Sequence, residues 1–327
     1  MRTFVKVLLG IVLLLVVVVA GFLIYFNASF PRVDKAADIK VDITPDRLAH
    51  GEYLVRHVTG CTDCHSMRDW RYFAGPVIPG TEGEGGEHWS AKDGLPGDIY
   101  AKNITPVGIG DWTDGELIRA FTEGVAKDGT ALFPLMPYQH FAHLAQEDVY
   151  DIVAYIRSLQ PLQKATPERK LKFPMNLIVK TIPKMAEPMA VPDSSDTLAY
   201  GKYLVSIAPC SDCHTPMDDK GQPIPGMDFA GGFTMLVPSG GTVRSANITP
   251  DPETGIGNWT KEAFVERFKM YDSPDARMME VARGSFNTVM PWTEFAGMSE
   301  YDLGAIYEYL RTVKPVKNAV NRFTPES

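Results

Sequence analysis

Most of the sequence consists of two similar copies, and this internal repeat predicts two domains of the same kind. "GEYLVRHVTGCTDCH" at 51–65 matches "GKYLVSIAPCSDCH" at 201–214, and "NITPVGIGDWT" later matches "NITPDPETGIGNWT". A match without gaps then relates residues 136–162 to 290–316. Two copies in the same order are too few for a solenoid, and 327 residues suffice for about two domains.

The N-terminal segment is apolar enough to cross a membrane. Val7–Phe26 holds twenty residues without a charge, and about 20 such residues span a bilayer core as a helix. Arg2 and Lys6 precede it, so the positive-inside rule places the N-terminus in the cytoplasm. A cleaved signal peptide is the alternative, but its apolar region is usually about 7–15 residues. We expect a single-pass anchor in a bacterial cytoplasmic membrane, with the remaining chain on the periplasmic side.

Each copy ends in an amphipathic helix. Apolar residues recur at i, i+3, i+4 and i+7 from Val149 and again from Leu303. Pro161 and Pro315 are expected to end these helices. No long alternating strand pattern is present, and Gly and Pro are frequent between the helical stretches. The sequence predicts an all-α fold, with two helical domains that carry long Gly/Pro-rich loops.

The stretch between the copies is rich in Pro and Lys, which predicts an extended connector and not a third domain. Its basic residues allow it either to dock on an acidic surface or to remain solvated. The predicted segments are an anchor at 1–30, a tether at 31–44, a first domain at 45–162, a linker at 163–196, a second domain at 197–320 and a tail at 321–327.

The charge balance excludes one class of partner. The formal net charge is −8, and no basic stripe interleaved with aromatic residues is present. A nucleic-acid partner is therefore not expected. An acidic surface suits a basic redox protein, or keeps the chain soluble.

The four cysteines form two pairs, each with a histidine directly behind it. The pattern C-x-x-C-H is that of c-type haem attachment. Two thiols on one helical turn can each form a thioether bond to a haem vinyl group, and the adjacent imidazole then lies under the iron. The predicted attachment residues are Cys61, Cys64, Cys210 and Cys213, and the predicted proximal ligands are His65 and His214.

Other uses of paired cysteines fit less well. A zinc site would need two neighbouring pairs, and these lie about 150 residues apart in the sequence. A thioredoxin-like motif needs no following histidine and belongs to a βαβ context. Structural disulfides would leave the two histidines unexplained. The sequence therefore predicts two covalently attached haem c groups.

The second iron ligand can be sought by elimination. After the linker the only histidine is His214, so a methionine is the best distal ligand there. Met290 lies in a loop far downstream of the haem motif, and Met136 is its counterpart in the first copy. His140 is the nearest rival of Met136. A His/Met pair raises the reduction potential over a His/His pair and leaves no open position, which favours electron transfer over chemistry at the iron.

Two further pairs of repeated residues are candidates for the haem-pocket wall. Trp112 and Trp259 carry an indole N–H that a haem propionate could accept. Asn103 and Asn247 could donate in the same way. The alternative is that Asn closes the "NITP" turn and that Trp is part of the core.

With these residues in place, the chain resembles the class I cytochrome c fold written in tandem. More closely, it resembles the membrane-bound cytochrome c subunits of periplasmic alcohol, aldehyde and gluconate dehydrogenases. The shared features are "GxYL" before "CxxCH", then "NITP" with "GIGxWT", then "MPY" or "MPW", and a closing helix. They cover about 51–316, apart from the linker.

The resemblance implies a membrane-anchored dihaem cytochrome that relays single electrons and is not itself an enzyme. Its expected partners are respiratory subunits between a quinol-oxidising complex and a terminal oxidase. The alternative is the electron-accepting subunit of an alcohol, aldehyde or sugar dehydrogenase. A dihaem peroxidase is a third possibility and would need an iron with an open site.

Overall fold

The computed structural model describes residues 2–219 and 221–326 and is helix-rich, with 40% of the chain in helices. The α-helices are α1 (Arg2–Ser29), α2 (Pro45–Tyr53), α3 (Cys61–Cys64), α4 (Pro106–Ile109), α5 (Asp114–Glu123), α6 (Tyr138–Phe141), α7 (Gln146–Ser158), α8 (Met175–Ile178), α9 (Thr197–Ile207), α10 (Cys210–His214), α11 (Lys261–Lys269), α12 (Pro274–Arg277), α13 (Trp292–Phe295) and α14 (Glu300–Leu310). A π-helix, η1 (Leu54–Val58), and two 3-10 turns, η2 (Ala91–Asp93) and η3 (Val179–Thr181), complete the helical elements of the described residues.

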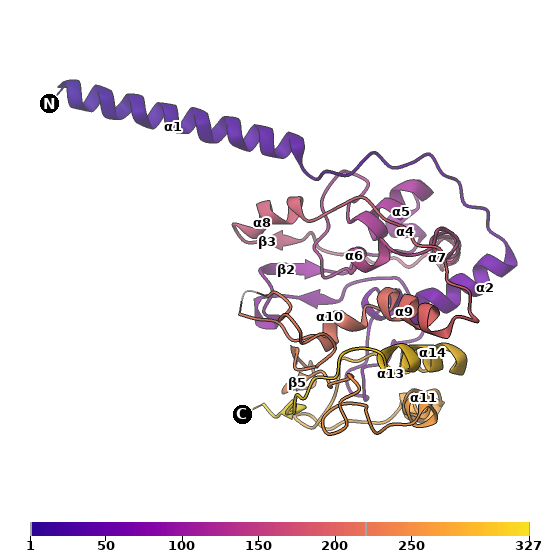
Figure 1. Ribbon diagram of the computed structural model, residues 1–327. Coiled ribbons are helices and arrows are strands. Elements are labelled where there is room, and N and C mark those ends of the chain that lie inside the picture. Colours follow the sequence, from indigo (N-terminus) through magenta and orange to yellow (C-terminus); the bar gives the residue numbers. More distant parts are fainter. Residues whose placement is uncertain (1, 220, 327) are drawn as a thin grey trace.

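Helix α1 projects from the rest of the molecule (Figure 1). Its most apolar window has a mean hydropathy of 3.4, and none of that window is buried in the protein. The helix is long and apolar enough to cross a bilayer, which agrees with the predicted anchor. At about 1.5 Å per residue, its 28 residues exceed the roughly 30 Å of a hydrocarbon core.

The fold differs from the all-α prediction by two small antiparallel sheets. Their strands are β1 (His88–Trp89), β2 (Gly97–Tyr100) and β3 (Lys170–Leu171), then β4 (Thr234–Leu236), β5 (Thr242–Arg244) and β6 (Phe323–Thr324). Strand β3 lies in the predicted linker and pairs with β2, while β6 lies in the predicted tail and pairs with β5. The linker and the tail thus each add an edge strand to the repeat that precedes them.

In each repeat the first helix crosses the last one at a glycine. A Cβ on Gly51 of α2 would lie 2.0 Å from the Asp151 carbonyl oxygen of α7, and one on Gly201 of α9 would lie 2.0 Å from the Ala305 oxygen of α14. No side chain fits at such a distance. The glycine of each "GxYL" segment is therefore required for the close approach of the two helices.

A one-residue difference between the repeats is absorbed by η1. Tyr53 precedes Cys61 by eight positions, whereas Tyr203 precedes Cys210 by seven. The extra residue widens the first helix into a π turn, a common way to accommodate one inserted residue. His57 in this turn reaches the second repeat, where its Nδ1 lies 2.7 Å from the Glu294 carbonyl oxygen.

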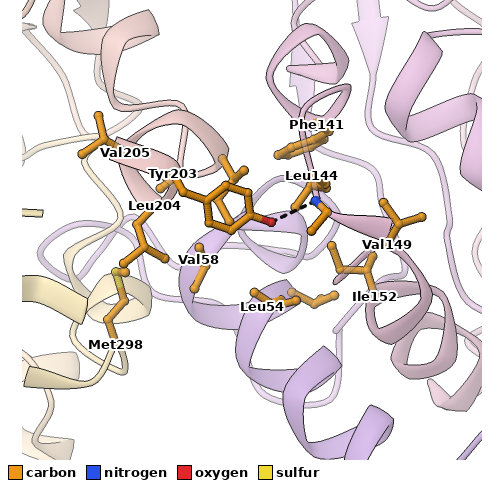
Figure 2. Close-up of a cluster of buried hydrophobic side chains, with 14 of the residues drawn as sticks. Leu54, Val58, Phe141, Leu144, Val149, Ile152, Tyr203, Leu204, Val205 and Met298 are labelled. Atoms are coloured by element: carbon orange, nitrogen blue, oxygen red, sulfur yellow. Dashed lines mark hydrogen bonds between the residues drawn. The ribbon is translucent and has the colours of Figure 1, made fainter. Parts of the chain in front are cut away.

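The two repeats share one hydrophobic core. Leu54 and Val58 of the first repeat and Leu204 and Met298 of the second are each at most 3% exposed and belong to a single buried cluster. Figure 2 shows these side chains around the ring of Tyr203. Because burial of apolar surface drives association, this shared core holds the repeats together as one body.

A reciprocal pair of tyrosine contacts crosses the interface between the repeats. The Tyr203 hydroxyl donates to Asp148 and accepts from the Ala145 N–H (3.0 Å) at the start of α7 (Figure 2). The Tyr53 hydroxyl donates to Asp302 and accepts from the Ser299 N–H (3.0 Å) at the start of α14. Each repeat therefore caps the last helix of the other.

This contact makes a prediction about stability. Tyr203→Phe removes the hydroxyl and leaves the Ala145 N–H and an oxygen of buried Asp148 without that partner. We expect a loss of about 1–3 kcal/mol in the free energy of unfolding, measured from urea unfolding midpoints. Tyr301→Phe is the matched control: its ring is 50% exposed, and we expect a change within about 0.5 kcal/mol. Equal shifts in the two variants would contradict this assignment.

Candidate haem sites

Both repeats contribute to one large cavity. Its volume is about 2430 Å³, more than twice that of a typical small-molecule site of about 300–1,000 Å³. The lining includes all eight predicted thioether and axial residues, namely Cys61, Cys64, His65, Met136, Cys210, Cys213, His214 and Met290. The structure thus brings the predicted sites of both repeats to a common space that suits two large cofactors.

The two histidines of the haem motifs have the same hydrogen bond. His65 Nδ1 lies 2.7 Å from the Lys102 carbonyl oxygen, and His214 Nδ1 lies 2.8 Å from the Ala246 carbonyl oxygen. A carbonyl only accepts, so Nδ1 must carry the proton and Nε2 keeps its lone pair. Burial lowers the pKa of His214 to about 4 and also lowers that of His65, so both rings are neutral at pH 7. A neutral imidazole with a fixed Nδ1–H is the form that binds a metal through Nε2.

The four cysteines are free thiols that face the cavity. Burial raises the pKa of Cys64 and Cys210 to about 12, and that of Cys213 to about 11. Each pair stands directly ahead of a histidine whose Nδ1 is bound to a carbonyl oxygen, which is the arrangement expected for haem c attachment.

The predicted distal methionines occupy equivalent places. Met136 precedes α6 and Met290 precedes α13, and both side chains are half-buried on the cavity wall. His140, the rival of Met136, does not line the cavity. Its Nε2 lies 2.6 Å from Asp212 of the second repeat. The structure therefore engages the His140 ring with a carboxylate, while Met136 lines the cavity, which favours Met136 as the distal ligand.

The His140–Asp212 contact predicts a pH dependence. Burial acts to lower the pKa of His140, but the ion pair with Asp212 outweighs it and raises the pKa above its usual 6.5. A histidine pKa that is raised in the folded state stabilises the protein at pH values below 6.5. This added stability is lost as the pH rises through the pKa of the folded protein. We expect His140→Gln to destabilise the protein at pH 5.5 more than at pH 8.5, in urea unfolding at both pH values. Asp212→Asn removes the same pair and should reproduce the pattern; a pH-independent difference would contradict it.

The structure gives the two repeated asparagines other partners than a haem propionate. The amide of Asn103 donates to the carbonyl oxygens of Leu162 (2.8 Å) and Lys164 (3.1 Å), and its Oδ1 accepts from the Thr105 N–H. Asn247 donates in the same way to Thr254 and Val316, and accepts from Thr249. Both amide hydrogens are thus engaged, and the residues close the "NITP" turn and hold the chain that follows the last helix.

The two tryptophans remain candidates for the pocket wall. Trp112 and Trp259 line the cavity, and no indole hydrogen bond to another described residue is present. Trp259 is 39% exposed, so it is not a plain core residue. An indole N–H on a cavity wall can donate to a cofactor carboxylate, and we retain that role as a proposal.

The two haem motifs face each other across the repeat interface. Burial raises the pKa of Cys213, and the carboxylates of Asp212 and Asp63 raise it further. Burial and Asp63 likewise raise the pKa of Glu294, which is 3% exposed and lies in the repeat position of His140. Both motifs line one cavity, and His140 of the first repeat lies 2.6 Å from Asp212, which stands between the cysteines of the second motif.

Some residues that shape the sites could not be found from the sequence. The carbonyl oxygens of Lys102 and Ala246 orient the two histidines, and any residue type can supply them. The N–H groups of Gly85 and Gly231 donate to the carbonyl oxygens of the same histidines, at 2.8 and 2.7 Å. The one available signal was that Lys102 and Ala246 each directly precede an "NITP" segment.

Comparisons with known proteins identify cytochrome subunits among the relatives of this chain. The chain is 29% identical over 279 residues to the fructose dehydrogenase cytochrome subunit of Gluconobacter japonicus, covering 81% of this chain and 52% of that protein. It is 30% identical over 287 residues to the gluconate 2-dehydrogenase cytochrome c subunit of Pantoea cypripedii, covering 80% and 58%. The chain therefore spans little more than half the length of these relatives.

A third relative is of similar length. The chain is 28% identical over 272 residues to a dihaem c-type cytochrome of Cereibacter sphaeroides, covering 79% of this chain and 83% of that protein. No family model matches the chain. Over about four fifths of its length, the chain is thus similar to cytochrome subunits of fructose and gluconate dehydrogenases and to a dihaem c-type cytochrome, which confirms the resemblance predicted from its sequence.

Proposed function

We propose that this chain is a membrane-anchored dihaem c-type cytochrome that relays single electrons on the extracytoplasmic side. The observation that carries this proposal is the common cavity, into which both C-x-x-C-H motifs and both methionines project. A haem c bound at each site would supply reversible one-electron iron chemistry. The four cysteines would hold the two groups, and His65 with Met136 and His214 with Met290 would be the axial pairs.

The chain itself would surround the two proposed haem sites and hold them close to each other. His214 is buried, and this burial lowers its pKa, while Cys64 and Cys213 are exposed in the open cavity. Two protein ligands per iron would leave no coordination position for a small substrate, which argues against a dihaem peroxidase. The neighbouring motifs would place the two groups close enough to exchange electrons. Helix α1 would keep this relay at the membrane surface.

The electron donor follows from the relatives. Two of them are named as cytochrome subunits of dehydrogenases, so we propose a separate dehydrogenase chain as the donor. A relay between a quinol-oxidising complex and a terminal oxidase is the second candidate. It is supported by the dihaem c-type cytochrome, the relative that this chain spans to 83% of its length.

Purification in mild detergent from native membranes separates these roles. We expect a flavin or quinoprotein dehydrogenase chain in the same particle, and haem absorption that becomes reduced when that enzyme's substrate is added. Oxidase or quinol-oxidising subunits in the particle would instead assign the chain to the respiratory relay. A preparation without bound haem would overturn both roles.

A further inference from the structure

We propose that residues 170–185, called the basic segment below, form a second membrane contact that rests the first repeat on an anionic bilayer surface. The sequence predicted these residues as part of an extended linker. In the structure they contain β3, α8 and η3. The inference rests on the proposed insertion of α1 into the membrane.

The basic segment carries only positive charge. It holds Lys170, Lys172, Lys180 and Lys184 and not one Asp or Glu, in a chain whose net charge is −8. Clustered lysines next to a membrane helix are attracted to anionic headgroups. Residues 309–325 also hold four basic and no acidic residues. The basic segment is distinguished by its hydrogen bonds to the end of α1 and to the chain that follows it.

Apolar side chains accompany the lysines. Phe173 is 79% exposed and Met185 is 45% exposed, and neither lines the cavity. Phe173 directly follows the exposed Lys172. An aromatic ring beside lysines is typical of segments that lie in the headgroup region of a bilayer.

The basic segment lies at the end of α1 where the apolar run stops. Lys180 Nζ donates to the Asn27 side-chain oxygen (2.6 Å), and the Asp34 N–H donates to Met185 Sδ (3.3 Å). Asn27 is the first polar residue other than tyrosine after the apolar stretch that ends at Phe26. If α1 crosses the bilayer, Asn27 lies at the level of the lipid headgroups. Lys180, which is hydrogen-bonded to Asn27, then lies at the same level. In Figure 1, α8 and β3 lie on the side of the molecule from which α1 projects.

The basic segment is also held firmly against the first repeat. Strand β3 pairs with β2, and the Lys172 N–H donates to the Pro96 carbonyl oxygen (2.8 Å). On its inner side, Met175, Ile178 and Ile182 line the cavity that both haem motifs line. The basic segment therefore lies between this cavity and the proposed membrane surface.

Spin labels in lipid nanodiscs test the contact on the full-length protein with its haems attached. Thioether bonds consume the four native cysteines, so a single added cysteine is the only free thiol. Labels are placed by Phe173→Cys, by Val16→Cys in the middle of α1, and by Met278→Cys, an exposed position of the second repeat. The nanodiscs contain phosphatidylethanolamine and phosphatidylglycerol and no other protein. Label accessibility to oxygen and to a water-soluble nickel chelate is measured in the oxidised protein by power saturation. Each value is taken relative to a nitrogen-equilibrated sample of the same variant, so that relaxation by the ferric haems cancels.

We expect the oxygen-to-nickel accessibility ratio at position 173 to exceed that at 278 several-fold and to approach that at 16. Equal ratios at 173 and 278, with a high ratio at 16, would overturn the membrane contact while the anchor stands. A low ratio at 16 would overturn the anchor itself and this inference with it. Attached haem and its reduction are unaffected by either outcome, so the proposed electron relay is judged separately.

Charge reversal separates lipid attraction from simple exposure. Lys172→Glu with Lys184→Glu, combined with the label at 173, should lower the ratio several-fold towards its value at 278. Lys202→Glu with Lys314→Glu makes the same charge change at exposed positions of the second repeat and should leave the ratio unchanged. An equal response to the two pairs would contradict attraction between the basic segment and the headgroups.

Discussion

Replacing both cysteines of one motif is expected to halve the haem content of the protein. Cys210→Ser with Cys213→Ser removes both thioether partners of the second site, while the first motif keeps its thiols and its oriented histidine. Haem c is held by those bonds, so we expect attached haem to fall from two groups per chain to one. Haem absorption after denaturation, together with the mass of the intact chain, gives the stoichiometry.

The repeat supplies the matched control for this experiment. Cys61→Ser with Cys64→Ser is expected to leave one haem, now in the second site, and the fourfold variant is expected to leave none. The mass of each product identifies which cysteine pair carries the haem. Two haems retained after loss of either pair would contradict attachment at these motifs.

Met290→His is expected to lower the reduction potential of one haem and leave the other near its original value. The methionine thioether favours ferrous iron, whereas a second imidazole favours ferric iron. We therefore expect a fall on the order of 0.2 V, within the ~0.8 V over which axial ligands tune haem potentials. Potentiometric titration followed by haem absorption would resolve one shifted and one unshifted component.

Two further variants check this assignment. Met136→His should shift the other component by a similar amount, since Met136 and Met290 occupy equivalent places beside the same cavity. Met278→His, at a side chain that is 64% exposed and outside the cavity lining, should shift neither. A Met290→His protein with both potentials unchanged would show that this residue is not a ligand.

The residues of the proposed haem sites could be proposed from the sequence because the attachment pattern depends on covalent spacing. Two cysteines and a histidine on one helical turn need only local sequence to be recognised, and the duplication then locates Met136 through Met290. The hydrogen bonds that orient His65 and His214 could not be predicted, because backbone carbonyl groups leave no trace in residue type. Side-chain partners were equally hidden: both "NITP" asparagines bond to threonine hydroxyls of their own turn and to carbonyl oxygens after the last helix of the repeat.

The fold likewise has some elements that could be predicted from the sequence and others that could not. Long amphipathic helices such as α7 and α14 were predictable from their periodicity. Strands β3 and β6 have only two residues each, too few for alternation to be seen, and they form only because a partner strand lies beside them. The lysine- and proline-rich stretch between the repeats lacks a periodic pattern, and its tertiary contacts give it structure.

The central claim is that two haems lie side by side in one cavity, and circular dichroism in the Soret region tests it most directly. Two haem transitions held close together couple and give a pair of bands of opposite sign, while isolated haems do not. We expect this couplet in the fully reduced wild-type protein and its loss in both single-haem variants. A wild-type spectrum equal to the sum of the two single-haem spectra would contradict the account.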